Sequence, residues 1–168
     1  IESIRKTDLN MDKPEHWSDK DIIHFLDVLR SVSKPTLIAA NKIDLPTSEE
    51  NIERMKESRY TVVPCSAEAE LALRRAGEKG LIDYTPGDCK LTTKNAEKLN
   101  AAQKKALDAI QEHILYKFGS TGVQEAINTA FFKLLQMVAV YPVEDCEHLS
   151  DHKGRVLPDV YLFPYGTT

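Results

Sequence analysis

Two short apolar segments, each followed by a polar loop and a helical pattern, constrain the fold of this chain more than any other feature. Residues 36–40 form one of these segments, and residues 60–65 form the other. Short apolar runs without alternation are typical of strands buried in a parallel sheet, in which neighbouring strands are joined through a helix. The sequence therefore predicts an α/β fold that contains part of a doubly wound sheet.

Helical patterns surround both predicted strands. Ser18 is a typical N-cap, and the apolar residues after it are three and four apart until Lys34 and Pro35 end the pattern. Shorter helical patterns run over residues 47–57 and from residues 66–67 to about residue 80. The order helix, strand, helix, strand, helix is the one expected for a doubly wound sheet.

Beyond residue 81 the pattern changes to turns and two long amphipathic helices. Residues 83–88 have the composition of a turn-rich linker. The threonine pair 92–93 is predicted to cap the first helix, which ends at Gly119, and residues 120–121 begin the second. The short joint between them predicts a helical hairpin.

The last part of the chain has the pattern of two strands. Residues 137–143 and 160–163 are mostly apolar, and a polar loop over residues 144–154 lies between them. The loop is longer than a tight hairpin turn, and we expect the two strands to pair across it.

The composition excludes several classes of protein. Hydrophobic residues make up 42% and charged residues 29% of the chain, which is too apolar for disorder. A formal net charge of -4 argues against coating of nucleic acid through charge alone, and we find no apolar run long enough to span a membrane. The three cysteines lie far apart, which is typical of reduced thiols in the cytoplasm. The chain begins without Met and ends directly after a strand-like run, so we expect it to be a piece of a longer protein.

The loop after the first predicted strand carries the most informative motif. Asn41, Lys42 and Asp44 form an N-K-x-D pattern, which is the guanine-reading loop of GTPases. The Asp44 carboxylate can accept hydrogen bonds from N1–H and N2–H2 of guanine, a pair of donors that adenine does not present. Asn41 can donate its amide to N7 and brace the neighbouring loops. The Lys42 stem can lie along the face of the base.

Ser66 and Ala67 follow the second predicted strand and form the S-A element that offers backbone N–H groups to guanine O6. Because ligands bind at the carboxyl ends of strands in open α/β sheets, both loops are expected at one edge of the sheet. The alternative is an ordinary polar loop with a surface ion pair, in which Ser66 only caps a helix.

The arrangement is that of a Ras-like GTPase fold, and the chain resembles the archaeal-type branch of the Obg/YchF-related GTPases of the TRAFAC class. The resemblance rests on N-K-I-D, on residues 140–145 and on residues 154–168, which end in a P-x-G-[ST]-T turn. It implies that residues 1–82 are the guanine-binding half of a GTPase domain and that residues 83–136 are a helical segment. Residues 137–168 would begin a TGS-like, ubiquitin-like β module. It also implies a cytoplasmic P-loop NTPase that binds GTP or GDP, with Mg²⁺ only in the full-length protein.

Several departures limit what this chain can do by itself. No G-x-x-x-x-G-K-[ST] phosphate loop occurs in it, so we expect no catalytic residue and no metal ligand. Residues 151–154 mimic the D-x-x-G magnesium-switch motif, but they follow N-K-x-D where that motif should precede it, so we interpret them as a turn. The spacing of Cys146, His148 and His152 is interpreted as a solvated loop and not as a metal site. Glu68 stands where many relatives carry Lys.

Two functional hypotheses follow. In the first, the chain is the guanine-nucleotide-binding portion of an Obg/YchF-type GTPase whose hydrolysis needs elements outside it. The alternative is an interaction module that contacts the ribosome or RNA, because lysines concentrate in the helical segment; a solvated, balanced face explains them as well. These lysines are Lys90, Lys94, Lys98, Lys104 and Lys105. Neither hypothesis includes a membrane or DNA as a partner.

Overall fold

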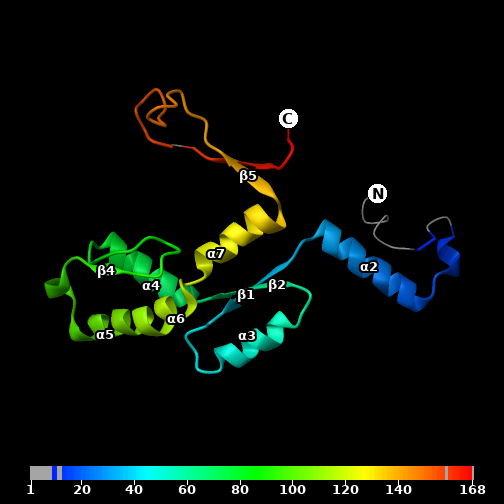
Figure 1. Ribbon diagram of the computed structural model, residues 1–168, viewed down its shortest axis with the longest axis horizontal. Coiled ribbons are helices and arrows are strands. Elements are labelled where there is room, and N and C mark those ends of the chain that lie inside the picture. The colour runs from blue at the N-terminus through cyan, green and yellow to red at the C-terminus, as the bar shows by residue number, and fades with distance from the viewer. Residues whose placement is uncertain (1–8, 11–12, 158, 168) are drawn as a thin grey trace. The chain divides into compact units, whose positions relative to one another are not determined.

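The computed structural model describes residues 9–10, 13–157 and 159–167 and divides the chain into two compact units, Ile1–Thr36 and Leu37–Thr168 (Figure 1). Residues 1–8, Pro158 and Thr168, which belong to the sequence patterns considered above, lie outside the described residues.

The first unit contains the short 3-10 helix η1 (Pro14–His16) and helix α2 (Asp19–Ser33). Ser18 and Asp21 form a capping box at the start of α2, in which Ser18 N donates to Asp21 Oδ2 at 2.9 Å and Asp21 N donates to Ser18 Oγ at 3.3 Å. The predicted helix and its N-cap are therefore confirmed, because the cap satisfies backbone donors that the first turn leaves unpaired.

The second unit is built on two parallel strands. β1 (Leu37–Asn41) and β2 (Thr61–Cys65) pair in register from Leu37 opposite Thr61 to Asn41 opposite Cys65. Helix α3 (Ser48–Lys56) joins them, and helix α4 (Ala67–Glu78) follows β2. The predicted order of strands and helices is confirmed. In the described residues this sheet has two strands, so β1 is less buried than the sequence predicts.

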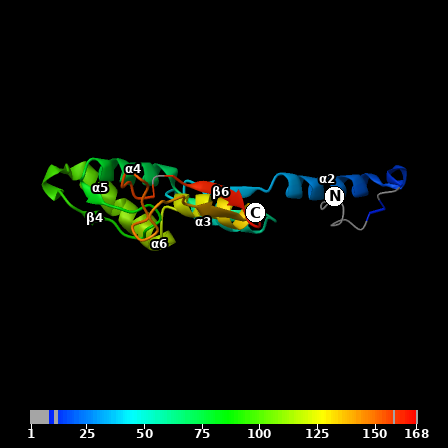
Figure 2. The same cartoon turned by 90° about the horizontal axis from the view of Figure 1, so that it is seen from above.

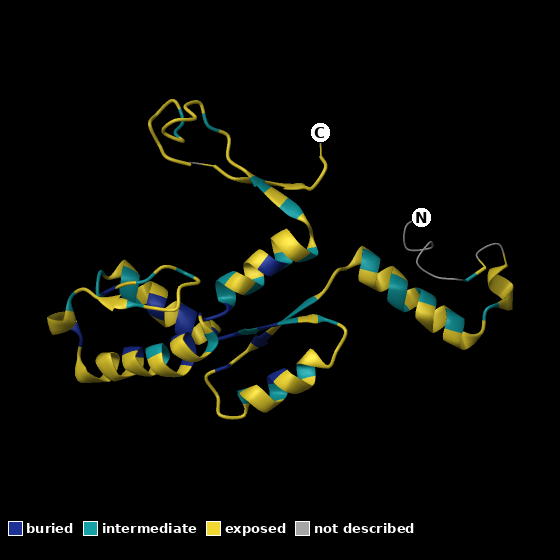
Figure 3. Cartoon of the chain, in the orientation of Figure 1, coloured by how far each residue is buried: buried dark blue, intermediate teal, exposed yellow. Residues whose placement is uncertain are grey.

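Two apolar clusters hold these elements together. The first joins the sheet, α3, α4 and the later helical segment through Ala40, Ile43, Ile52, Ala69 and Ile114. The second packs the helical segment against α4 and contains Leu73, Ile82, Leu99, Leu107 and Leu115. Figure 3 shows the buried residues gathered around β1, β2 and the start of α4.

The predicted cap of the first long helix is wrong. The threonine pair forms strand β4 (Thr92–Thr93), which pairs antiparallel with β3 (Ile82–Asp83). After the short helix η2 (Ala96–Lys98), Asn100 caps helix α5 (Ala101–Ile110) through a capping box with Gln103. The helix therefore begins later than predicted, because Asn100 supplies the acceptor for its first turn.

Helix α5 continues through the π-helical segment η3 (Gln111–Leu115) into α6 (Tyr116–Phe118), which ends at Gly119 with a left-handed φ of 82° as predicted. Helix α7 (Val123–Asn128) then begins after Gly122 and continues as the π-helical segment η4 (Thr129–Leu134). The cap predicted at residues 120–121 is therefore wrong as well.

The predicted helical hairpin is not formed. Helix α7 contacts β2 and β1, and it does not run back along α5 (Figures 1 and 2). An amphipathic stripe shows that a helix buries one face, but the identity of the covering element depends on the turn before it. Here the turn over residues 119–122 directs α7 to the sheet.

The two predicted terminal strands do pair. β5 (Met137–Val140) runs antiparallel to β6 (Tyr161–Pro164), with Val138 opposite Phe163. In the loop between them, Asp151 Oδ1 accepts from the backbone N–H groups of Lys153 and Arg155, each at 2.9 Å. The D-x-x-G-like segment is therefore a turn closed by its own aspartate, as interpreted from the sequence.

Within the described part of the chain, no helix is both long enough and apolar enough to cross a membrane. The same residues contain no group of three or more His, Cys, Asp or Glu side chains that could hold a metal ion, which includes the Cys146, His148 and His152 pattern.

Candidate functional site

The loops that follow β1 and β2 leave the sheet at the same end. Asn41 and Cys65 are paired at the last position of the two strands, and Ile43 N donates to Cys65 O at 3.3 Å beyond it. Because parallel strands share a direction, this register places N-K-I-D beside the S-A element. The predicted juxtaposition of the two loops is confirmed.

Asn41 joins the two loops through its side chain. Its Oδ1 accepts hydrogen bonds from Lys42 N at 2.8 Å and from Ala67 N at 3.1 Å. Both bonds use the amide oxygen, so the amide nitrogen points the opposite way and keeps its two donors for another partner.

Ser66 makes the second connection. Its hydroxyl donates to Asp44 Oδ1 at 3.0 Å and accepts from Ala69 N at 3.3 Å as the N-cap of α4. Ser66 is buried at 1% exposure, whereas Asp44 is exposed. A fixed, buried hydroxyl therefore orients one oxygen of an accessible carboxylate.

Lys42 adopts a left-handed backbone conformation with a φ of 72°. For a residue with a side chain this conformation costs about 1–2 kcal/mol, and such residues concentrate at functional sites. The conformation is held by a turn in which Leu45 N donates to Lys42 O at 3.1 Å and by Ser48, whose hydroxyl donates to Ile43 O at 3.0 Å.

The backbone donors of the S-A element differ from the sequence expectation. Ala67 N–H donates to Asn41 Oδ1, and Ser66 N–H donates to Thr121 O at 2.8 Å. Each N–H therefore already has an acceptor within the protein. The Ser66 N–H is bonded to the turn before α7, and a ligand would have to share the Ala67 N–H with Asn41 Oδ1.

An open hollow of about 500 Å³ lies on the α3 side of the first loop. Asn41 and Lys42 line it together with residues of α3, but Asp44, Ser66 and Ala67 do not. The hollow thus lies beside only part of the candidate site and adds nothing to the assignment of Asp44, Ser66 and Ala67.

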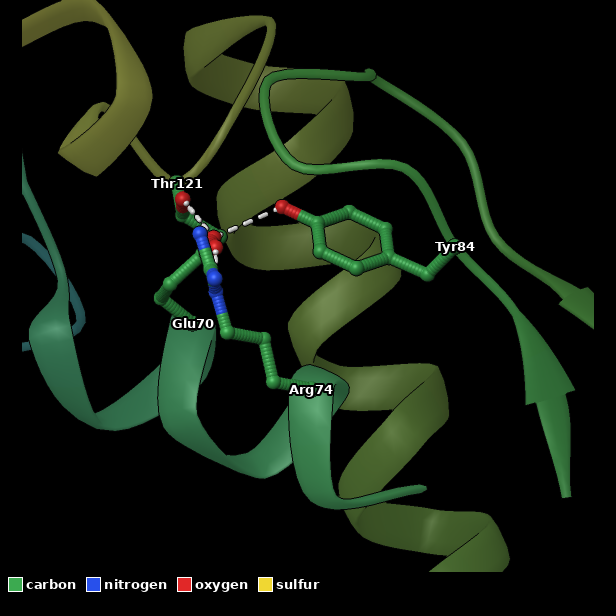
Figure 4. Close-up of polar contacts among 4 residues, drawn as sticks. All are labelled: Glu70, Arg74, Tyr84 and Thr121. Atoms are coloured by element: carbon green, nitrogen blue, oxygen red, sulfur yellow. Dashed lines mark hydrogen bonds and ion pairs between the residues drawn. The ribbon is translucent and has the colours of Figure 1, made fainter. Parts of the chain in front are cut away.

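A buried polar cluster beside Ser66 was not found by sequence reasoning (Figure 4). The Glu70 carboxylate, at 4% exposure, accepts from Thr121 Oγ1 at 2.6 Å and Tyr84 OH at 2.8 Å on Oε2, and contacts Arg74 Nε at 2.6 Å through Oε1. Burial raises the pKa of Glu70, but the hydrogen bonds from Thr121, Arg74 and Tyr84 outweigh it and leave that pKa below its usual value. The available sequence signal was a glutamate between the apolar residues Ala69 and Leu73 on the inner face of a helix.

Cys65 and Lys94 have structural roles. Cys65 is buried, and burial raises the pKa of its thiol, so it is unsuited to act as a nucleophile. Lys94 Nζ lies 3.1 Å from Asp83 Oδ2, and this ion pair fits the interpretation of the lysines as a charge-balanced face.

Comparisons with known proteins identify a family and several relatives of this chain. Residues 39–145 match the family described as Obg-like GTPase YGR210-like, G4 motif-containing domain. The chain is 44% identical to an uncharacterized GTP-binding protein of Methanocaldococcus jannaschii, in a match that covers 99% of this chain and 42% of that protein. It is 31% identical to an uncharacterized GTP-binding protein of Schizosaccharomyces pombe, in a match that covers 95% of this chain and 41% of that protein. It thus spans less than half of these relatives.

A solved structure described as a GTP binding protein from Pyrococcus horikoshii OT3 is similar as well. It has 39% sequence identity and a TM-score of 0.62, with 99% of this chain and 42% of that chain covered. The family match extends over more than half of the sequence and includes both loops of the candidate site. The chain therefore belongs to the YGR210-like family of Obg-like GTPases, as a part that contains its G4 motif domain.

Proposed function

We propose that this chain supplies the guanine-reading side of a GTP- and GDP-binding site. The observation that carries the proposal is the pair of side-chain bonds between the loops, Asn41 to Ala67 and Ser66 to Asp44. They hold the two groups that recognise different edges of one base in a single arrangement. The relatives named as GTP-binding proteins support the same conclusion.

Each residue has a separate task in this site. The Asp44 carboxylate accepts N1–H of guanine on the oxygen that Ser66 holds and N2–H2 on its other oxygen, and the Asn41 amide nitrogen donates to N7. Ala67 N–H is shared between Asn41 Oδ1 and guanine O6. The Lys42 stem covers the face of the base, with its ammonium group toward the phosphates.

Hydrolysis belongs to the full-length protein in this proposal. Phosphate binding and Mg²⁺ coordination need a phosphate loop, and the chain has none, so we assign no catalytic residue and no magnesium ligand to it. The same proposal places the protein in the Obg/YchF group of the TRAFAC class and in the cytoplasm. It also divides the chain into three parts at residues 82 and 136 and identifies β5 and β6 as the start of a TGS-like module. A ribosome or RNA contact is not proposed, since no described contact of the lysines favours it.

Competition binding on the full-length protein tests the base preference. GTP should displace a labelled guanine nucleotide at least about tenfold more effectively than ATP does, because adenine offers no donor pair to Asp44 and leaves the carboxylate unmatched. Equal displacement by GTP and ATP would contradict the proposal.

The 168-residue chain alone should bind GTP weakly or not measurably. Most of the affinity in this class of site comes from backbone N–H groups around the phosphates and from Mg²⁺, which these residues do not provide. Isothermal calorimetry is the measurement, and submicromolar binding by the isolated chain would show that the phosphate contacts had been missed.

A further inference from the structure

Thr121 lies in the turn before α7, yet it contacts both the S-A loop and the Glu70 carboxylate. We infer that Thr121 and Glu70 are positioning residues for base recognition, which couple the helical segment to the loop that reads guanine O6. This inference rests on the proposed guanine site. It assigns a role to residues that do not themselves contact the nucleotide.

The geometry is a closed circuit of three hydrogen bonds. Ser66 N donates to Thr121 O at 2.8 Å, Thr121 Oγ1 donates to Glu70 Oε2 at 2.6 Å, and Glu70 N donates to Ser66 O at 3.1 Å. Thr121 is fully buried and Glu70 is 4% exposed, so water does not compete for these bonds. Thr121, which lies 51 positions beyond Glu70 in the sequence, therefore helps to fix the backbone of Ser66, directly before Ala67.

Tyr84 provides a matched comparison within the same cluster. Its hydroxyl donates to the same Glu70 Oε2 at 2.8 Å, but Tyr84 comes from the segment between β3 and β4 and makes no described bond to the S-A loop (Figure 4). Removing either hydroxyl takes one donor from the same carboxylate oxygen. Only the loss of the Thr121 hydroxyl also releases the turn that fixes Ser66.

The experiment compares GDP with 6-thio-GDP on the full-length protein. The sulfur of 6-thioguanine is a weak acceptor, while N1–H and N2–H2 are retained, so the affinity ratio of the two nucleotides reports on the O6 contact. Thr121→Val should reduce the preference for GDP over 6-thio-GDP about fivefold, which corresponds to the free energy of one lost hydrogen bond. Tyr84→Phe and the hydroxyl-retaining Thr121→Ser should keep the wild-type ratio.

The outcomes distinguish failure of the positioning role from failure of the guanine site. If the wild-type protein binds GDP and ADP equally, the proposed guanine site itself is wrong. If it selects GDP but Thr121→Val retains the wild-type ratio, or Tyr84→Phe lowers the ratio as much, the positioning role is overturned and the guanine site stands. Should Thr121→Val not fold, Thr121→Cys carries the same expectation, because a thiol is a weak donor of similar size.

Discussion

Exchange of Asp44 for asparagine in the full-length protein is expected to turn the base preference from GTP toward xanthosine triphosphate. The Ser66 hydroxyl donates to Asp44 Oδ1, so the amide oxygen of an asparagine can keep this bond and also accept N1–H of the base, while its NH₂ group faces position 2 of the base. Xanthine carries a carbonyl in place of the N2 amine of guanine and accepts from that NH₂ group, whereas guanine meets it with a donor. A mismatched buried polar pair costs about 1–3 kcal/mol, so discrimination should change about ten- to hundredfold.

Competition among GTP, ATP and xanthosine triphosphate on both proteins measures this change. Glu68→Gln is the matched control, because it removes the same charge from the neighbouring exposed position after Ala67 without touching the base-reading pair. An unchanged ranking of the three nucleotides in Asp44→Asn would remove Asp44 from the site. A change of equal size in Glu68→Gln would show that the effect comes from the loss of a negative charge and not from a contact between Asp44 and the base.

The sequence was sufficient for those parts of the site that depend on local order. Two apolar runs joined by a helical pattern predict parallel strands, and parallel strands bring the residues after each strand to one edge. Asn41 and Ala67 are therefore in contact although they lie 26 positions apart. The N-cap function of Ser66 was also visible, because a serine before an apolar helical pattern satisfies the first turn.

Other features depend on contacts that no local pattern contains. The strands β3 and β4 are two residues long, so they have no periodicity, and the threonine pair in β4 has the same letters as a helix cap. The Glu70 cluster needs the turn over residues 119–122 to return to α4, which the helical stripes do not specify. For the same reason the sequence does not predict that α7 packs against the sheet and forms no helical hairpin with α5.

Gly122 is the point at which this long-range arrangement should be most sensitive to substitution. Its φ is +77°, and a Cβ placed there would overlap the carbonyl oxygen of Pro64 and lie 2.9 Å from Cys65 Cα. These are backbone atoms of β2, which cannot shift without disturbing the pairing with β1. Gly122→Ala should therefore destabilise this unit by about 2–5 kcal/mol, combining the strain of a left-handed alanine with overpacking.

Gly119→Ala is the matched control, because Gly119 has a similar φ of +82° in the same turn, but a methyl group added there would have no described atom outside the adjoining backbone within 4 Å. It should cost about 1–2 kcal/mol, the strain alone. Hydrogen exchange of the full-length variants, followed in peptides covering β2 and Ser66, distinguishes the two: Gly122→Ala should speed exchange there far more than Gly119→Ala. Equal exchange in both variants would show that the turn is strained but does not brace the strand, and would remove the physical link between α7 and the base-reading loop.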